Sequence, residues 1–279
     1  MKHIVMTGVT SGLGAEWLYQ LDQTESATFY ILARSPDKCQ RMIASRPLIN
    51  RFFVIYADCD SLKSIADAAQ AVVDLTDSVD LLVNNAGIWS NPAEERSKDG
   101  FEMIFAVNHL ATFVLTEKLL PLLSAASSAR IVNTASFMHW VAWLDQADVE
   151  LKNKFNSLRA YSNSKLFTIL ATQQLARRLK GGNIQVNCFD PGIVNTPMLS
   201  HAWPRALLIF FPLFSKLIAR SPQKGAETGV FLSTSSQCQG ITGQYFRDKK
   251  VARISWKARK SGLSDWLLHE SRRLTEPFV

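Results

Sequence analysis

The sequence predicts a single α/β domain built on a doubly wound parallel sheet, with helices on both faces of that sheet. Two observations predict this fold class. Short runs rich in β-branched and aromatic residues alternate with longer segments of helical spacing, which is typical of successive βαβ units. The first short run also leads directly into a group of glycines and then into a helical segment. Because crossovers between parallel strands are right-handed, we expect helices on both faces.

The expected elements follow one another in a regular order. Short apolar runs predict strands at residues 4–7, 27–33, 52–56, 81–83, 130–134, 184–189 and 244–246. Periodic apolar positions predict helices at residues 12–21, 61–75, 101–123, 161–179 and 223–234. Ser61 is a suitable N-cap for the second of these helices, and the pair Gly181-Gly182 is a suitable stop for the fourth.

Two segments lie outside this alternation. Residues 195–221 fit it least well, and we interpret them as a flap over the substrate. Residues from about 247 to 279 form a basic C-terminal extension. The chain has no internal repeat or Pro/Gly-rich linker, and 47% of its residues are hydrophobic against 20% charged, so residues 1–279 are expected to form one domain.

The formal net charge of +7 is concentrated near the C-terminus. The cations there are Arg247, Lys249, Lys250, Arg253, Lys257, Arg259 and Lys260. Such a run is either a solvated basic face or a peripheral contact with an anionic membrane surface. No nucleic-acid-binding motif accompanies the charge, so we expect no nucleic-acid partner.

The four cysteines indicate a reducing compartment. Cys39, Cys59, Cys188 and Cys238 show neither CxxC spacing nor a histidine at metal-ligand spacing, so we expect no disulfide and no metal site. The chain enters its first strand at once, too early for a signal peptide, and a cytoplasmic location is expected. The apolar stretch at residues 206–214 is interrupted by proline and bounded by charge; it is unable to span a bilayer but able to lie on one.

A glycine loop joins the first strand to the first helix. Glycines in such a loop let the backbone turn tightly and approach a pyrophosphate, while the helix N-terminus offers free N–H groups. The alternative is an ordinary strand–helix turn. The spacing Gly-x-x-x-Gly-x-Gly resembles the motif of the short-chain dehydrogenase/reductase family, which binds NAD or NADP on a single-domain Rossmann fold. The cofactor-binding candidates here are Gly8, Thr10, Ser11, Gly12, Leu13 and Gly14.

The end of the second strand indicates which cofactor is used. An NAD site needs a carboxylate there for the ribose hydroxyls, whereas an NADP site needs a cation for the 2′-phosphate. The strand ends in Leu32-Ala33-Arg34-Ser35, without Asp or Glu. A guanidinium grips phosphate bidentately, so Arg34 with Ser35 predicts NADP(H). The alternative is a surface arginine at a strand end.

Three more segments resemble cofactor-binding motifs of the same family. Asp58, followed by Cys59, resembles the aspartate that contacts the adenine. The Asn-Asn-Ala-Gly segment resembles one that stabilises the sheet and lies along the cofactor. The Pro-Gly segment after the sixth strand resembles one that binds the nicotinamide carboxamide. The resemblance therefore implies cofactor roles for Asn85, Ala86, Gly87, Pro191, Gly192, Val194 and Thr196.

Tyr161 and Lys165 form the predicted catalytic pair. Their spacing of four places both on one face of a helix, and a nearby ammonium favours the phenolate of a tyrosine. Ser136 ends the fifth strand, at an edge that faces the ligand. In the family, the matching serine holds the substrate oxygen, the lysine also binds the nicotinamide ribose, and the asparagine matched by Asn108 anchors a water through its backbone. We expect the neighbouring His109 to be a structural helix histidine.

Several strings resemble the retinol dehydrogenase branch of this family, over roughly residues 1–250. They are Val107-Asn108-His109-Leu110, Ala129-Arg130-Ile131-Val132-Asn133, Ser164-Lys165-Leu166, Gln223-Lys224-Gly225-Ala226-Glu227-Thr228 and Gly243-Gln244-Tyr245-Phe246. The resemblance implies hydride transfer with a small lipophilic aldehyde, ketone or alcohol, and a homodimer or homotetramer formed through the long helices. This chain departs from many members in starting without an N-terminal anchor. The alternative function is a non-catalytic NADP-binding sensor or scaffold.

Overall fold

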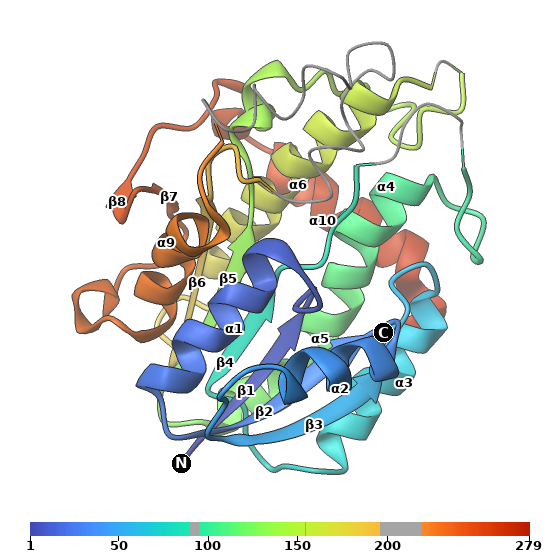
Figure 1. Ribbon diagram of the computed structural model, residues 1–279. Coiled ribbons are helices and arrows are strands. Elements are labelled where there is room, and N and C mark those ends of the chain that lie inside the picture. The colour runs from blue at the N-terminus through green and yellow to red at the C-terminus, as the bar shows by residue number, and fades with distance from the viewer. Residues whose placement is uncertain (90–94, 154, 196–218) are drawn as a thin grey trace.

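A twisted eight-stranded sheet organises the described part of the chain, residues 1–89, 95–153, 155–195 and 219–279 of a computed structural model (Figure 1). The strand order is β3-β2-β1-β4-β5-β6-β7-β8, and every pair is parallel except β7 with β8. The order reverses between β1 and β4, which confirms the doubly wound fold. The strands are β1 (Lys2–Thr7), β2 (Ala27–Ala33), β3 (Arg51–Tyr56), β4 (Leu81–Asn84), β5 (Ala129–Thr134), β6 (Ile184–Asp190), β7 (Tyr245–Arg247) and β8 (Lys250–Val251).

Helices cover both faces of the sheet (Figure 1). On one face lie α1 (Gly12–Thr24), α2 (Pro36–Ala44) and α9 (Pro222–Thr234). On the other lie α3 (Leu62–Val73), α5 (Ala111–Ala125), α6 (Ser157–Arg178) and α10 (Leu263–Thr275). The short elements are α4 (Met103–Phe105), η1 (Ala106–Leu110), η2 (Phe137–Val141), η4 (Ser236–Cys238), η5 (Lys257–Arg259) and η6 (Glu276–Phe278).

The two helical layers create two hydrophobic cores, one on each side of the sheet. Along β1, Val5 faces the core beneath α3 and α5, whereas Ile4 and Met6 face the core beneath α1 and α9. This alternation is the two-residue period of a strand. All seven residues of β2 are buried. A strand covered on both sides must be apolar throughout, which explains the continuous apolar runs in the sequence.

The main differences from the expected elements have local causes. The long helix expected at residue 161 begins at Ser157 because the Asn156 side chain caps it, accepting a hydrogen bond from the Arg159 backbone at 2.9 Å. Helix α2 was not expected from the sequence, although Pro36 at its first turn suits a helix start. The end of the supposed C-terminal extension is also helical, as α10.

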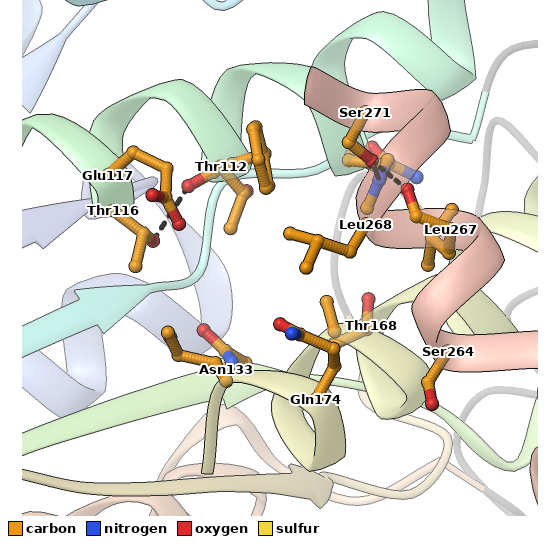
Figure 2. Close-up of a pocket in the computed structure, with 15 residues that line it drawn as sticks. Thr112, Thr116, Glu117, Asn133, Thr168, Gln174, Ser264, Leu267, Leu268 and Ser271 are labelled. Atoms are coloured by element: carbon orange, nitrogen blue, oxygen red, sulfur yellow. Dashed lines mark hydrogen bonds between the residues drawn. The ribbon is translucent and has the colours of Figure 1, made fainter. Parts of the chain in front are cut away.

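Helix α10 packs against α6 and belongs to the core. Its Leu263 and Leu267 are buried, and Arg177 of α6 donates hydrogen bonds to Ser264 at 2.7 Å and to Asp265 at 2.9 Å. Leu267 and Leu268 close a cavity of about 50 Å³ between α5, α6 and α10 (Figure 2). Helix α10 therefore covers part of the α6 face that was expected to form an oligomer contact. Oligomerisation stays a prediction.

A π-helical turn, η1, places two consecutive polar side chains inside the protein. Asn108 and His109 are both buried. The His109 ring stacks on Phe105 with centroids 5.5 Å apart, and its Nε2 lies 2.7 Å from the Ser271 hydroxyl of α10. That hydroxyl donates to the Leu267 carbonyl, so His109 must be the donor to Ser271. Burial lowers the pKa of His109 to about 3, which fits the structural role expected for it.

One helical run in the described residues, Met103–Ala125, is long and apolar enough to cross a membrane. Of its apolar window, 67% is buried inside the fold. Leu115 and Leu119 of this run lie in the core beneath the sheet, so core packing accounts for its apolar character.

Replacing His109 by Phe should make the protein more resistant to acid. The unfolded chain binds a proton at this histidine below pH 6.5, whereas the folded chain does so only near pH 3. Folding stability is therefore lost as the pH falls through this window, by about 1.4 kcal/mol per pH unit. Between pH 7 and 4.5, we expect the Tm of His109→Phe to fall several degrees less than that of the unmodified protein.

The exposed His269 on α10 gives a matched control. The variant His269→Gln should keep the acid sensitivity of the unmodified protein. An equal fall in Tm for His109→Phe and the unmodified protein would contradict the burial of a neutral histidine.

Candidate active site

The predicted site residues meet at the carboxyl ends of the central strands, where the strand order reverses. Gly8 follows β1, Asn85 follows β4, Ser136 follows β5 and Pro191 follows β6. Parallel strands place these ends at one edge of the sheet, which is where doubly wound folds bind ligands. The structure therefore brings together segments that lie more than a hundred residues apart.

The glycine loop lies directly against the end of β4. A Cβ on Gly14 would lie 2.1 Å from the Gly8 carbonyl oxygen, and one on Gly8 would lie 2.6 Å from the Ala86 nitrogen. Gly8 and Gly12 also have positive φ, at +70° and +54°. Neither contact permits a side chain. The glycines are thus required by the fold of this loop itself.

Hydrogen bonds fix the same junction. The Thr7 hydroxyl donates to the Val83 carbonyl at 3.3 Å and accepts from the backbone nitrogens of Asn85 and Ala86, both at 3.0 Å. The Asn85 amide donates to the Gly8 carbonyl at 2.8 Å. Helix α1 begins beside this junction without an acid in its first turn. A helix N-terminus of this kind fits the pyrophosphate of a dinucleotide.

The end of the site predicted to bind the adenosine presents cations. Arg34 and Ser35 follow β2 and are exposed, and the Ser35 side chain makes no capping hydrogen bond. Asp58 follows β3; its Oδ2 accepts from Lys98 Nζ at 2.7 Å and its Oδ1 from the Asp60 backbone at 3.2 Å. Burial would raise the pKa of Asp58, but these hydrogen bonds lower it below its ordinary value.

Two further features of this end were not expected. Lys98 was not predicted, because its partner lies forty positions away in the sequence. Cys59 is partly buried against the core beneath α3, and burial raises the pKa of its thiol to about 12. That thiol therefore acts as a small apolar group.

The four predicted catalytic residues form one cluster. Tyr161 and Lys165 lie on consecutive turns of α6, and Lys165 Nζ is 5.5 Å from the centroid of the Tyr161 ring. The same Nζ donates to the Thr134 carbonyl of β5 at 3.0 Å. The Ser136 hydroxyl lies close enough to the Tyr161 phenol to lower the pKa of that phenol. All four, Asn108 included, are buried.

Asn108 connects this cluster to the segment after β4. Its Oδ1 accepts from the Ile88 nitrogen at 2.8 Å, and its Nδ2 donates to the Ile88 carbonyl and to Ser164 Oγ, both at 3.0 Å. A Cβ on Gly87 would lie 3.3 Å from this Oδ1. The side chain of Asn108 therefore holds Gly87 and Ile88 beside Lys165.

Burial controls the protonation of the catalytic pair. It raises the pKa of Tyr161 well above its ordinary value; the nearby Ser136 hydroxyl lowers it and the charge of Asp190 raises it further. Burial lowers the pKa of Lys165 to about 8, against an opposing effect of Asp190. The expectation that the ammonium would favour the phenolate is therefore outweighed in this structure by desolvation. Burial therefore favours the protonated form of Tyr161.

Apolar side chains pack around Tyr161, and the sequence did not predict them. The Trp89 ring stacks on the Tyr161 ring, with centroids 4.4 Å apart and planes 5° from parallel. Trp89 directly follows Gly87-Ile88, so its place after the Asn-Asn-Ala-Gly segment was the available signal. The residues packed around Tyr161 are Ile88, Trp89, Ile104, Met138, Leu151, Phe155 and Ala160.

Two charged residues, Asp190 and Arg220, contact the Pro-Gly segment, and neither contact was predicted from the sequence. Asp190 Oδ1 accepts from the Gly192 nitrogen at 2.9 Å, and Gly192 has φ of +78°. A Cβ there would lie 2.9 Å from Nε of Arg220, whose guanidinium pairs with Asp248.

The backbone after this turn is also held. Arg220 donates its N–H to the Ile193 carbonyl at 2.7 Å, and its own carbonyl accepts from Asn195 at 3.0 Å. Val194 is buried. Thr196, and the expected flap except for residues 195 and 219–221, lie outside the described residues.

Comparison with known proteins agrees with this geometry. The family model described as short chain dehydrogenase matches residues 2–206. Human retinol dehydrogenase 13 is 31% identical over 281 residues, covering 98% of this chain and 84% of that protein.

Two solved structures are also similar. An uncharacterised protein from Mycobacterium paratuberculosis has a TM-score of 0.79 at 26% identity, covering 99% of this chain and 94% of the other. The RhlG/NADP active-site complex of Pseudomonas aeruginosa has a TM-score of 0.68 at 26% identity, covering 88% and 93%.

The chain belongs to the short-chain dehydrogenase/reductase family of oxidoreductases and takes a nicotinamide cofactor. Within the family, its relatives place it in the retinol dehydrogenase-like branch, which confirms the resemblance found in the sequence.

The variant Gly14→Ala should lose cofactor binding. Its methyl group would collide with the Gly8 carbonyl, so the loop must open away from Asn85. We expect the affinity for NADPH and for NADH to fall at least about tenfold, equivalent to about 1.4 kcal/mol. Fluorescence titration of the reduced cofactors measures this.

Gly182→Ala is the matched control, since its Cβ would lie 3.3 Å from its closest neighbour, at the other end of β6. A folded Gly14→Ala protein with unchanged affinity would show that this loop does not bind the cofactor.

Proposed function

We propose that the protein is an NADP(H)-dependent oxidoreductase that interconverts a lipophilic aldehyde or ketone with its alcohol, using Tyr161 as general acid and base. The observation that carries this proposal is the buried Tyr161 phenol, which lies beside Ser136 and Lys165. Apolar side chains surround this phenol, and such surroundings favour its protonated form, which can donate a proton.

Each side chain has a role in reduction. The Ser136 hydroxyl and the Tyr161 phenol together hold the carbonyl oxygen of the substrate. The reduced nicotinamide, when bound, supplies the hydride to the carbonyl carbon. Tyr161 gives its proton to the oxygen as negative charge develops there, and takes it back in alcohol oxidation. Lys165, held at the Thr134 carbonyl, would bind the nicotinamide ribose and carries the charge that stabilises the phenolate left behind.

NADP rather than NAD is favoured by the free cation after β2. Arg34 is exposed, makes no ion pair with any described residue and is followed by a free serine hydroxyl. In the described part of the chain, Asp58 is the carboxylate at the neighbouring strand end, and it is already paired with Lys98. A 2′-phosphate would find a guanidinium and a hydroxyl at this strand end.

A lipophilic substrate is favoured by the surroundings of Tyr161. Trp89, Met138 and Phe155 pack around the phenol, and none offers a charged group to a polar substrate. We also propose a cytoplasmic, membrane-peripheral location; the four free cysteines support a reducing compartment. A homodimer or homotetramer would need a helix face other than the part of α6 covered by α10.

Tyr161→Phe should abolish turnover and keep cofactor binding. The variant removes only the phenolic oxygen, and general acid–base catalysis contributes roughly 10²–10⁴-fold. The measurement is NADPH oxidation with a series of aliphatic, aromatic and polyisoprenoid carbonyl compounds, together with an NADPH titration. We expect kcat/KM to rise with the apolar surface of the substrate.

Tyr56→Phe, at an exposed tyrosine of β3, is the control for this experiment. Persistent turnover in Tyr161→Phe would exclude the proposed role of Tyr161. Tight NADPH binding without turnover on any compound would favour the non-catalytic sensor or scaffold.

Arg34→Gln should change the cofactor preference. Loss of a bidentate contact to the 2′-phosphate is expected to lower kcat/KM for NADPH roughly tenfold or more, since charged hydrogen bonds contribute about 1.5–3 kcal/mol. The value for NADH should stay the same. Arg41→Gln, on the exposed face of α2, is the control. Equal efficiency with both cofactors in the unmodified protein would remove this role from Arg34.

A further inference from the structure

Three tryptophans of the described chain project from one region of the surface. Trp140, Trp143 and Trp256 are 48%, 72% and 62% exposed, and Val141 beside them is 58% exposed. They come from two segments, the turn around η2 and the residues before η5. These segments lie side by side because the Ser255 nitrogen donates to His139 Nε2 at 3.1 Å. Exposed apolar groups gathered in this way usually mark a contact surface.

Trp143 and Trp256 both line one hollow of about 430 Å³. The other lining residues are the apolar Leu144, Leu166 and Leu263, the polar Gln146, and the cations Lys257 and Lys260. We call Trp140, Val141, Trp143 and Trp256, with these two lysines, the tryptophan–lysine surface. Apolar groups beside cations suit a partner that is itself apolar inside and anionic at its boundary.

The exposed rings are held by the fold. The Trp143 nitrogen donates to Asn163 Oδ1 at 2.9 Å, and the Trp143 carbonyl accepts from Arg159 Nε at 2.7 Å. His139 donates to the Ser136 carbonyl while it accepts from Ser255, so it ties the two segments together. The aromatic side chains are thus presented to solvent on fixed backbone, which reduces the entropy lost on binding.

The charges beside the rings have no partners within the described chain. Residues 250–260 contain five cations and no acid. Arg253, Lys257, Arg259 and Lys260 form no ion pair with any described residue, although Lys257 Nζ lies 5.1 Å above the Trp256 ring. Elsewhere, cations such as Arg177 and Arg220 are neutralised by acids. An anionic partner would complete this surface.

We propose that the tryptophan–lysine surface docks the protein on an anionic lipid bilayer. Tryptophan prefers the level of the lipid headgroups, where its ring is in apolar surroundings and its N–H stays wet. Lysine and arginine beside it meet the negative surface potential. The lysine stems cover apolar area while their ammonium groups remain at the headgroups.

The position of the surface gives it a use, which rests on the proposed function. Ser136 begins the turn that carries Trp140, so this turn joins the surface to the catalytic end of the proposed site. Arg159 and Asn163, which hold Trp143, lie two positions from Tyr161 and therefore on the opposite face of α6. Docking would keep an enzyme for lipophilic carbonyl compounds at the bilayer in which such compounds dissolve.

Vesicle co-sedimentation of the full chain tests the proposal. The vesicles are phosphatidylcholine, alone or with a third of phosphatidylserine, in low and high salt. We expect binding only with phosphatidylserine, weakened by salt. The partition coefficient should fall at least about tenfold in Trp143→Ala/Trp256→Ala. Lys257→Gln/Lys260→Gln should bind less and lose part of the salt dependence.

The control variant is Ile49→Ala/Leu75→Ala, two apolar residues exposed at the amino end of the sheet, which should bind like the unmodified protein. Absence of binding, or equal binding by the tryptophan variant, would overturn the proposal. So would dimerisation in solution that is lost only in the tryptophan variant, because it would assign the surface to a second copy of the chain. NADPH oxidation with a water-soluble ketone and no vesicles tests the proposed activity separately.

Discussion

The close approach of two backbone segments, the glycine loop after β1 and the Asn-Asn-Ala-Gly segment after β4, is the constraint on which the site depends. A methyl group at Gly8 or Gly14 would separate them. The Thr7 hydroxyl satisfies three backbone groups across the same gap. Because these two segments are in contact, the N-terminus of α1 and Asn108 both lie at the carboxyl edge of the sheet, next to the end of β4. Both the cofactor end and the catalytic end of the site therefore depend on the absence of side chains at these glycines.

Behind the crevice, a buried polar network aligns the strands with the helices. The Asn84 amide donates to Asn133 Oδ1 at 2.9 Å and to Thr116 at 3.2 Å, and Asn133 donates to Thr172 at 2.9 Å. This network joins β4, β5, α5 and α6. Asn84 Oδ1 has no partner among the described residues. Polar groups buried among apolar neighbours tolerate few alternative arrangements, so they fix the registers that bring Ser136 to Tyr161.

Local patterns in the sequence were sufficient to predict the sheet, the glycine loop and the residues that gather at the candidate site, whose catalytic roles stay predictions. Gly8, Arg34, Ser136 and Tyr161 follow strands or begin helices, and strand ends in a parallel sheet share one edge. What remained unpredicted depends on contacts between distant segments. Lys98 meets Asp58, Arg220 supports Gly192, and Trp89 stacks on Tyr161 across seventy residues.

Other differences have the same origin. The pKa of Tyr161 is raised rather than lowered, which was not expected because spacing reveals a neighbouring lysine but not the loss of water around both groups. Helix α10 was read only as part of a charged extension, since its buried face is defined by α6. The cofactor role of the whole Pro-Gly segment stays a prediction, and Thr196 lies outside the described residues.

The hydrogen bond from His109 to Ser271 has a consequence for the order of synthesis. The ribosome releases α10 after every other helix of the sheet's two layers, yet α10 packs against the π-helical turn that holds Asn108. The contact between His109 and Ser271 can therefore form only after α10 has been synthesised, whereas the glycine loop and the strands β1 and β4 that enclose it come much earlier in the chain.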